Sequence, residues 1–198
     1  FVMGRDFDAV NVIFVLGGPG AGKGTLCEQL SQKFGYAHYS AGDLLRSAAK
    51  SDTEQGKMLS QMMANGEIVP SAITIGLLRK SIEETTETDT FLIDGFPRNI
   101  SQGEEFENSI TKCKFVLFLD APKEIMQERI LKRAAETKSA RNDDNLASLD
   151  KRFKTHFETC MPVIDHYQKQ NKVERVDATL PVEEVCSFVV GVCEKLKQ

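Results

Sequence analysis

The sequence feature that most constrains the fold is a glycine-rich segment, GGPGAGKGT at residues 17–25, which directly follows the apolar run VNVIFVL. A loop of this kind between a strand and a helix lets backbone N–H groups converge on phosphate oxygens, and the helix N-terminus adds its partial positive charge. Gly17, Gly22 and Lys23 satisfy the pattern G-x-x-x-x-G-K, in which the lysine reaches the β- and γ-phosphates. The segment predicts a phosphate loop, and an ordinary glycine-rich turn is the less favoured interpretation.

Short apolar runs and longer helical patterns alternate along the chain. The runs occupy residues 10–16, 91–93, 115–119 and 173–176, with residues 37–40 as a fifth candidate. Helical periodicity covers residues 24–34, 55–65, 71–84, 122–133, 146–170 and 181–197. Runs that are apolar on both faces and separated by helices indicate buried parallel strands, so we expect an α/β doubly wound sheet. Residues 41–69 and 134–145 fit the alternation less well and are expected to be excursions from the sheet.

The composition is that of one globular domain. Of 198 residues, 41% are hydrophobic and 27% are charged, which provides enough apolar side chains for a single core. A formal net charge of −4 disfavours nucleic acids and anionic membrane surfaces as partners. The longest apolar runs hold five residues and cannot span a bilayer. The five cysteines include no C-x-x-C pair, which indicates free thiols in a reducing compartment, and we expect a cytoplasmic protein, with nuclear presence left open.

Two arginines stand where an open α/β sheet binds its ligands. Arg46 ends the string SAGDLLR just after the second expected strand, and Arg98 ends FLIDGFPR just past the third. Such sheets bind ligands outside the carboxyl ends of their strands, and arginine matches phosphate in charge and in bidentate geometry. We therefore expect both arginines to bind phosphate. For Arg129, considered alone, a surface salt bridge is the better explanation.

Two aspartates, Asp94 and Asp120, each end an apolar strand beside the expected phosphate loop. A carboxylate in this place commonly holds Mg²⁺, directly or through water. Asp94 is favoured for this role, whereas Asp120 precedes Ala-Pro at a helix start, so that capping the helix is a strong competing role.

A phosphate loop alone does not separate a kinase from a switch GTPase or an ATP-driven machine. A GTPase would need the guanine-binding pattern N-K-x-D after a strand. The nearest string, at residues 171–174, ends in glutamate and precedes its strand, so we interpret it as coincidence.

Five strings in this order, GGPGAGKGT, SAGDLLR, NGEIVP, FLIDGFPRN and RNDDN, resemble the nucleoside monophosphate (NMP) kinases, the family of adenylate kinase and UMP-CMP kinase. The resemblance runs from about residue 11 to the C-terminus and is closest to UMP-CMP kinase. It implies a P-loop NTPase fold with a five-stranded parallel sheet in a core of residues 1–39, 70–132 and 144–198. It also implies an NMP-binding segment at 40–69 and a short LID at 133–143, although RAAETKSAR lacks both glycines of the usual R-G-x-[ST]-S-G-R.

The same resemblance implies the residues of the site. The ATP-binding set would be Gly18, Pro19, Gly20, Ala21, Gly22, Lys23, Gly24, Thr25, Arg129, Arg133 and Leu180. The NMP-binding set would be Ala41, Arg46, Glu67, Ile68, Val69, Gly95, Phe96, Arg98, Asn99, Gln102, Arg141 and Arg152, with a cis bond between Phe96 and Pro97. The catalytic residues would be Lys23, Arg98, Arg133, Arg141 and Arg152. Mg²⁺, the implied cofactor, would bind mainly through ATP and water, near Asp94 and Thr25.

The implied reaction transfers the γ-phosphoryl group of Mg·ATP to an NMP and yields ADP and a nucleoside diphosphate. Ala41 and Asn99 resemble UMP-CMP kinases, whereas Gln102 resembles the glutamine with which adenylate kinases read adenine. A primary amide offers one acceptor and two donors and can flip, so Gln102 suits adenine, cytosine or uracil. UMP and CMP are the expected acceptors, AMP is a further candidate, and adenylate kinase is the alternative. A P-loop ATPase, a switch or a non-catalytic nucleotide-binding module is the alternative of another class.

Phosphoryl transfer of this kind needs no general base. The acceptor phosphate, whose second pKa is about 6, is already largely ionised at neutral pH. Alignment of the substrates and neutralisation of their charge would supply the catalysis. We therefore interpret His38, His156 and His166 as structural or exposed. The resemblance also implies a monomer whose partners are small nucleotides.

Overall fold

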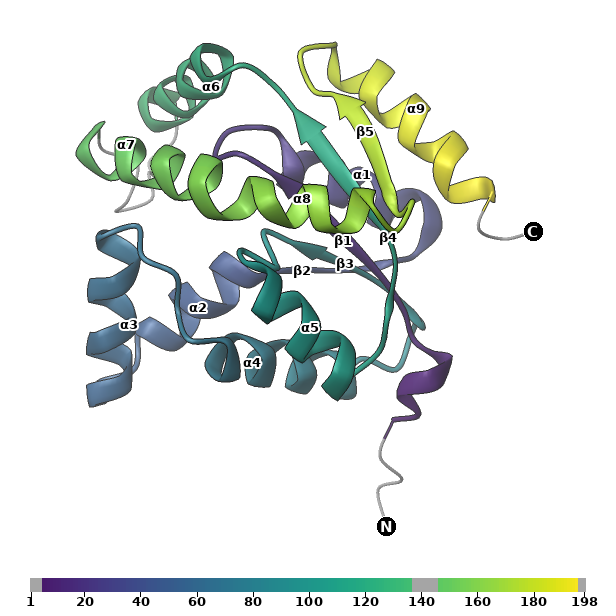
Figure 1. Cartoon of the computed structure of the whole chain (residues 1–198), viewed down its shortest axis with the longest axis horizontal. Helices are drawn as coiled ribbons and strands as arrows, with labels where there is room; N and C mark the ends of the chain where they lie inside the picture. The colour runs from purple at the N-terminus through teal and green to yellow at the C-terminus, as the bar shows by residue number, and fades with distance from the viewer. Residues whose placement is uncertain (1–4, 137–145, 196–198) are drawn as a thin grey trace.

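Five parallel strands form the centre of the computed structural model, which describes residues 5–136 and 146–195 (Figure 1). Their order across the sheet is β2 (Ala37–Ser40), β3 (Thr90–Asp94), β1 (Asn11–Gly17), β4 (Cys113–Asp120) and β5 (Val173–Asp177). Every pairing is parallel. β2 and β3 lie on one side of β1, and β4 and β5 lie on the other, so the loop after β1 lies where such sheets bind their ligands. The expected doubly wound sheet is confirmed, and each strand lies within two residues of its predicted bounds.

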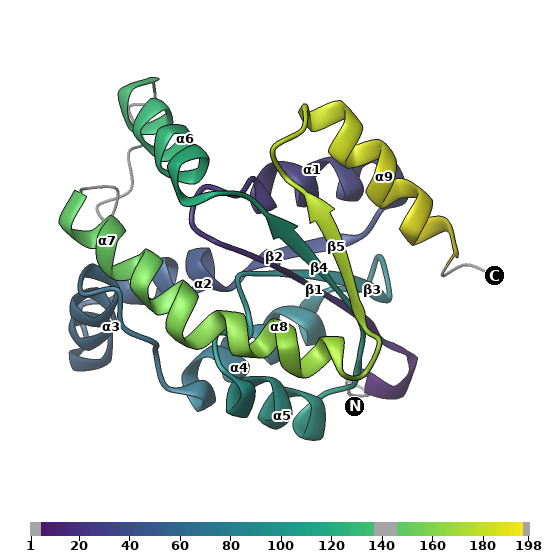
Figure 2. The same cartoon turned by 45° about the horizontal axis from the view of Figure 1, so that its top comes forward.

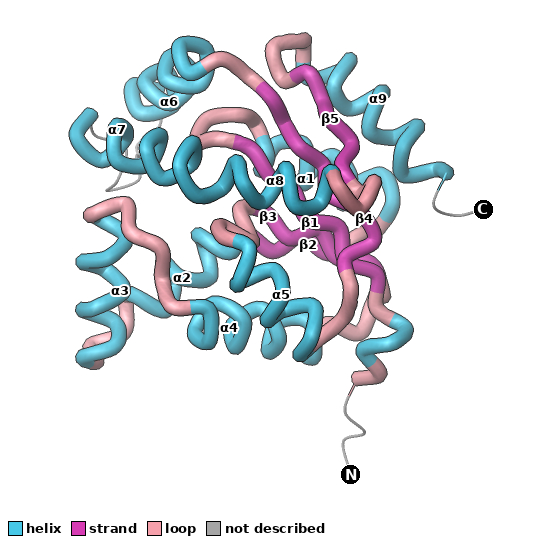
Figure 3. The backbone as a smooth tube through the Cα atoms, in the orientation of Figure 1, coloured by secondary structure: helices cyan, strands magenta, loops and turns pink. Residues whose placement is uncertain are grey.

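Helices connect the strands and cover both faces of the sheet (Figure 3). They are α1 (Lys23–Phe34), α2 (Ala41–Ala49), α3 (Glu54–Ala64), α4 (Ser71–Glu84), α5 (Ile100–Ser109), α6 (Lys123–Glu136), α7 (Leu146–Thr155), α8 (Met161–Gln168) and α9 (Val182–Lys195). A 3₁₀ turn, η1 (Phe7–Ala9), precedes β1, and a π-helical turn, η2 (His156–Cys160), joins α7 to α8.

Alternate residues of the strands enter two apolar layers, because successive side chains of a strand point to opposite faces. On β1, Ile13 and Val15 belong to the layer that also holds buried residues of α1, α6, α7 and α9. Val12, Phe14 and Leu16 belong to the other layer, with α4, α5 and α8. Figure 2 shows α1 and α9 on one side of the sheet and α4, α5 and α8 on the other. Coverage of both faces explains why the central strands β3, β1 and β4 are nearly continuous apolar runs in the sequence.

Two expectations about helices are wrong. The sequence pattern does not indicate α5, whose buried residues are only Gln102, Gly103 and Phe106. Two apolar side chains in ten residues, Ile100 and Phe106, set no helical period. The single helix expected over residues 146–170 is divided by η2 into α7 and α8, because apolar spacing continues through a π-helical turn without a visible break.

The helices α2 and α3 lie side by side beyond the sheet (Figures 1 and 2). They share a small apolar cluster of Leu45, Leu59 and Val69. Side chains cap both helices. At the start of α2, Ser40 Oγ accepts a hydrogen bond from the N–H of Asp43, and at the start of α3, Thr53 Oγ1 accepts one from the N–H of Gly56. This pair occupies the first expected excursion. Most of the second, and most of the predicted LID, lies outside the described residues.

All five cysteines are free, with Cys160 half-buried and the other four buried, as the sequence predicts. Across residues 5–136 and 146–195, the structure contains no helix of the length and apolar character that crossing a membrane requires.

One arginine attaches the N-terminal segment to the body of the protein. The Arg5 guanidinium donates hydrogen bonds to the backbone oxygens of Ile82 and Thr85, at the end of α4. It also donates to Thr88 O at 2.5 Å and forms an ion pair with Asp89 at 2.6 Å. The last carbonyl groups of a helix lack N–H partners within the helix, and Arg5 supplies hydrogen-bond donors to these carbonyls of α4.

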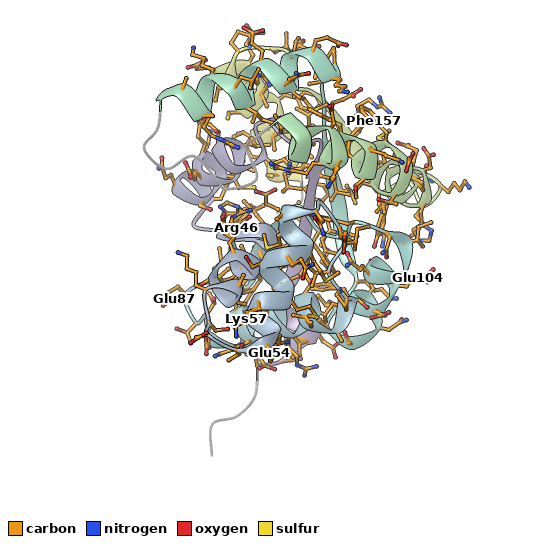
Figure 4. The ribbon with its side chains drawn as sticks, turned by 90° about the vertical axis from the view of Figure 1, so that its left-hand side faces the viewer. Arg46, Glu54, Lys57, Glu87, Glu104 and Phe157 are labelled. Carbon is orange, nitrogen blue, oxygen red and sulfur yellow. The ribbon has the colours of Figure 1, made fainter. Side chains whose placement is uncertain are left out.

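Arg5→Ala is expected to lower the free energy of unfolding by about 2 kcal/mol, because hydrogen bonds to charged groups contribute about 1.5–3 kcal/mol. Urea unfolding followed by circular dichroism measures the difference. The matched control is Lys57→Ala, which removes an exposed ion pair with Glu54 on α3 (Figure 4) and should cost less than about 0.5 kcal/mol. Equal losses in the two variants would contradict the capping role of Arg5.

Candidate functional site

A cavity of about 390 Å³ opens at the carboxyl ends of β1, β2 and β3, within the size range of small-molecule sites. Its walls come from the phosphate loop, α1, α2, the turn after β3, α6 and the helical run from α7 to α8. Figure 4 shows the Arg46 side chain on the side of the α2–α3 pair that faces the helices above it. The predicted residues that line the cavity are Pro19, Gly20, Gly22, Lys23, Gly24, Thr25, Arg46, Glu67, Asp94, Gly95, Arg98, Arg133 and Arg152.

The phosphate loop needs glycine at two positions. Gly20 and Gly22 have φ angles of +83° and +95°, which side chains with a Cβ rarely adopt. A Cβ on Gly20 would also lie 2.3 Å from the backbone oxygen of Met126. Gly22 is the N-cap of α1, so the unbonded N–H groups of the first turn of the helix face the cavity with the loop. Gly18 and Ala21 are buried and shape the loop from beneath.

Lys23, the first residue of α1, extends back over the loop. Its ammonium group donates hydrogen bonds to the backbone oxygens of Gly17 at 3.1 Å and Gly18 at 3.0 Å. Burial lowers the pKa of Lys23 from its usual value. The Asp94 carboxylate opposes this shift, and the positive charges of Arg152 and Arg98 add to it. The Lys23 ammonium group is therefore a poorly solvated cation beside the loop, and the oxygens of a bound phosphate would replace the missing water.

Asp94 is the best placed carboxylate for a cation. It ends β3, is 8% exposed and lines the cavity together with Thr25. Its Oδ2 lies 3.7 Å from Nε2 of His38, a buried atom that has no hydrogen-bond partner. The described residues contain no cluster of three or more metal-ligating side chains. This donor set fits an ion held mainly by a ligand's phosphates and by water, as Mg²⁺ commonly is.

The structure brings five of the seven predicted basic residues to the cavity: Lys23, Arg46, Arg98, Arg133 and Arg152. Arg46 forms an ion pair with Asp43 on its own helix. Arg98 follows a cis Phe96–Pro97 bond, as the resemblance implies, and its Nε donates to Gly95 O at 3.4 Å. The remaining two basic residues are Arg129, which is half-buried on α6 outside the cavity lining, and Arg141, which lies outside the described residues.

A small recess of about 20 Å³ adjoins the cavity and shares Arg98, Gly95, Glu67 and Met63 with it. Gln102 is 3% exposed and lies in its wall. The predicted NMP-binding residues that line the recess are Ala41, Glu67, Val69, Gly95, Phe96, Arg98 and Gln102.

Two backbone contacts hold the Gln102 amide in one of the two orientations that the sequence left open. Its Oε1 accepts a hydrogen bond from the N–H of Arg98 at 3.0 Å, and its Nε2 donates to Val69 O at 3.0 Å. A flipped amide would place its NH₂ group opposite the N–H of Arg98 and its oxygen opposite the backbone oxygen of Val69. The amide therefore offers a ligand one remaining N–H and one remaining lone pair.

Besides Gly18, Ala21 and Arg129, four further predicted residues lie outside both linings. Ile68 is half-buried, and Asn99 is the N-cap of α5, where its Oδ1 accepts from the N–H of Gln102 at 2.9 Å. Leu180 is 42% exposed just before α9. Asp120, the competing carboxylate, forms an ion pair with Arg175 of β5 at 2.6 Å.

Sequence reasoning missed several residues of the cavity wall, among them His38, Met63, Thr155, His156 and Cys160. Two of these are histidines that the sequence gave no reason to place at a site. Thr155 on α7 also donates a hydrogen bond to Gly66 O at 3.0 Å, which joins α7 to the segment after α3 across the cavity. No short motif marks these positions, because contacts between distant segments place them there.

Comparison with known proteins agrees with this geometry. The family model described as adenylate kinase matches residues 15–172. The chain is 47% identical over 181 residues to a protein named uridylate kinase from Saccharomyces cerevisiae, covering 90% of this chain and 88% of that one. It is 49% identical to UMP-CMP kinase 3 of Oryza sativa subsp. japonica, covering 92% and 85% of the two chains. It is 45% identical to adenylate kinase isoenzyme 1 of Rattus norvegicus, covering 94% and 95%.

Proposed function

Because the chain belongs to the adenylate kinase family and is a nucleoside monophosphate kinase, we propose that it phosphorylates UMP and CMP with ATP as donor. The observation that carries the acceptor is Ala41 in the wall of the recess beside Arg98, a position at which the sequence resembles UMP-CMP kinases. The names of the yeast and rice relatives support the same acceptors. Its five free thiols suit a reducing compartment, and we propose a cytoplasmic monomer.

Adenylate kinase activity is the second candidate, and Gln102 is the residue that favours it. The remaining N–H and lone pair of its amide match N1 and the N6 amine of adenine as well as they match the edges of cytosine or uracil. Gln102 therefore does not discriminate among these bases, and Ala41 together with the names of the yeast and rice relatives supports UMP and CMP.

The proposed roles follow from position. The phosphate loop and Lys23 bind the ATP phosphates, with Arg133 beside them. Arg46 and Arg98 hold the phosphate of the acceptor, and Arg152 faces the space between the two nucleotides. Asp94 and Thr25 would hold Mg²⁺ through water, and the bound ion would neutralise charge on the phosphate oxygens. The predicted ATP contacts of Arg129 and Leu180 and the role of Arg141 stay proposals.

Transfer then requires alignment of two anionic groups and exclusion of water. The basic side chains lower the repulsion between the nucleotides. The hydrogen bond from Thr155 to Gly66 supports a closed arrangement around both substrates. An acceptor already ionised at neutral pH attacks without a protein base.

One coupled assay tests the proposal by measuring ADP formation with UMP, CMP, dCMP, AMP and GMP in parallel. We expect kcat/KM for UMP and CMP to exceed that for AMP by at least about tenfold, the scale on which pocket size discriminates. A preference for AMP would establish the second candidate instead. Turnover with GMP alone would contradict the proposed base site, and phosphate release without an acceptor would indicate an ATPase.

A further inference from the structure

One buried histidine of the cavity wall has no role in the mechanism so far. His156 is the first residue of the π-helical turn η2, is 7% exposed and lines the cavity. Its neighbour Phe157 is 48% exposed and lies at the outer surface of the same turn (Figure 4). The turn therefore directs the imidazole inward and the aromatic ring outward, and π-helical turns are frequent at functional sites.

His156 lies against the phosphate loop. A Cβ on Gly18 would be 3.3 Å from its Cδ2, the ring carbon bonded to Nε2. Within the described part of the chain, no hydrogen bond joins its ring nitrogens to another residue. Its ring nitrogens are not among the buried side-chain atoms that lack a partner, so they are open to the cavity, where water or a ligand oxygen would complete their hydrogen bonds.

The imidazole is neutral at physiological pH. Burial lowers the pKa of His156 to about 4; the positive charge of Lys23 acts in the same direction, and the carboxylate of Asp120 opposes both. A neutral imidazole carries one N–H donor and one acceptor nitrogen. It can therefore donate to an anionic oxygen without adding a charge to a site that already holds several cations.

We propose that His156 is a further nucleotide-binding residue, in which one ring N–H donates a hydrogen bond to a phosphate oxygen of the triphosphate held by the phosphate loop. This inference rests on the proposed ATP-binding role of that loop. The N–H of His156 would orient the phosphate, whereas Lys23 supplies charge. The two donors approach the loop from different sides, because His156 lies on the α7–α8 side and the Lys23 ammonium extends from α1.

The test compares two variants that differ in their donors. His156→Phe keeps a planar ring and removes the N–H, whereas His156→Gln keeps an N–H donor. We expect His156→Phe to raise the KM for ATP by about tenfold, the factor that one hydrogen bond to a charged group supplies. The KM for the NMP should stay within about twofold, and His156→Gln should recover most of the ATP affinity. His166→Phe, on α8 with its ring bonded to Gln170, is the matched control and should change neither constant.

Thermal unfolding and direct ATP titration accompany the kinetics, so that each variant is compared as folded protein. If His156→Phe does not fold, His156→Leu takes its place with the same expected result. A folded variant without the donor and with wild-type ATP affinity would overturn the proposal. Equal losses in the Gln and Phe variants, or a rise in the KM for the NMP in place of ATP, would also overturn it. If Lys23→Met leaves ATP binding unchanged as well, the proposed ATP site itself is wrong; if only Lys23→Met weakens binding, the inference about His156 alone fails.

Discussion

Lys23→Met is expected to lower kcat at least about a hundredfold, the usual effect of removing one preorganised donor from a site of charge development. The physical reason is the state of the ammonium group in the structure. It is poorly solvated, and its hydrogen bonds within the described part of the chain go to the carbonyl oxygens of Gly17 and Gly18, so phosphate oxygens are stronger partners than those it has. Coupled measurement of ADP formation at saturating substrates gives kcat.

The same variant should not be less stable than the wild type. The pKa of Lys23 is lowered in the folded protein, so folding disfavours its protonated form and the unfolded chain binds the proton more tightly. This cost is fully present at pH values below the folded pKa, declines as pH rises through it, and is gone only above the unfolded pKa. Methionine removes the cost at neutral pH while keeping an unbranched chain, and thermal unfolding should show an equal or higher midpoint.

The matched control is Lys33→Met on the same helix, where the lysine is exposed and its ammonium lies over the ring of Phe34. It should leave kcat unchanged. A folded Lys23→Met enzyme with kcat within a few-fold of the wild type would contradict the role given to the phosphate loop.

Sequence patterns predict the centre of the sheet well because β3, β1 and β4 are buried on both faces. Each of these strands is a short apolar run that no amphipathic helix in this chain imitates, and residues 11–17 and 113–120 are the clearest examples. The helix α5 escapes prediction for the opposite reason. Its buried residues are Phe106, which packs against Phe14 of β1, a glycine, and a glutamine that the pattern counts as polar.

The residues of the site also differ in whether the sequence can predict them. The phosphate loop and Arg98 are predictable, because backbone conformation and strand topology determine where glycines and strand-end residues must lie. His38 and His156 are not, because isolated histidines are ordinary components of a core and only the tertiary structure places them at a cavity. The amide orientation of Gln102 depends on Val69 O and the N–H of Arg98, and the Val69 partner is distant in sequence.

Arg98→Ala is expected to lower kcat/KM for the NMP at least about a hundredfold, since it removes a charged donor from the point where the cavity and the recess meet. Arg98 is half-buried and follows the cis Phe96–Pro97 bond. Its backbone N–H donates a hydrogen bond to Oε1 of Gln102. Because alanine keeps that backbone N–H, the variant should retain the recess and lose only the phosphate contact. Direct titration should then show near-normal ATP affinity, in contrast to Lys23→Met.

Arg98→Lys separates charge from geometry at the same position. Lysine keeps the positive charge but cannot make two parallel hydrogen bonds to one phosphate, so it should recover only part of the loss. Arg79→Ala is the control, because Arg79 lies on the surface of α4 in an i,i+4 ion pair with Glu83 and should leave turnover unchanged. Full activity of Arg98→Lys would show that charge alone suffices there, and near-normal activity of a folded Arg98→Ala enzyme would remove Arg98 from the acceptor site. Because the Lys23 and Arg98 variants are expected to fail on different substrates, the pair of titrations determines which end of the cavity holds ATP and which holds the acceptor.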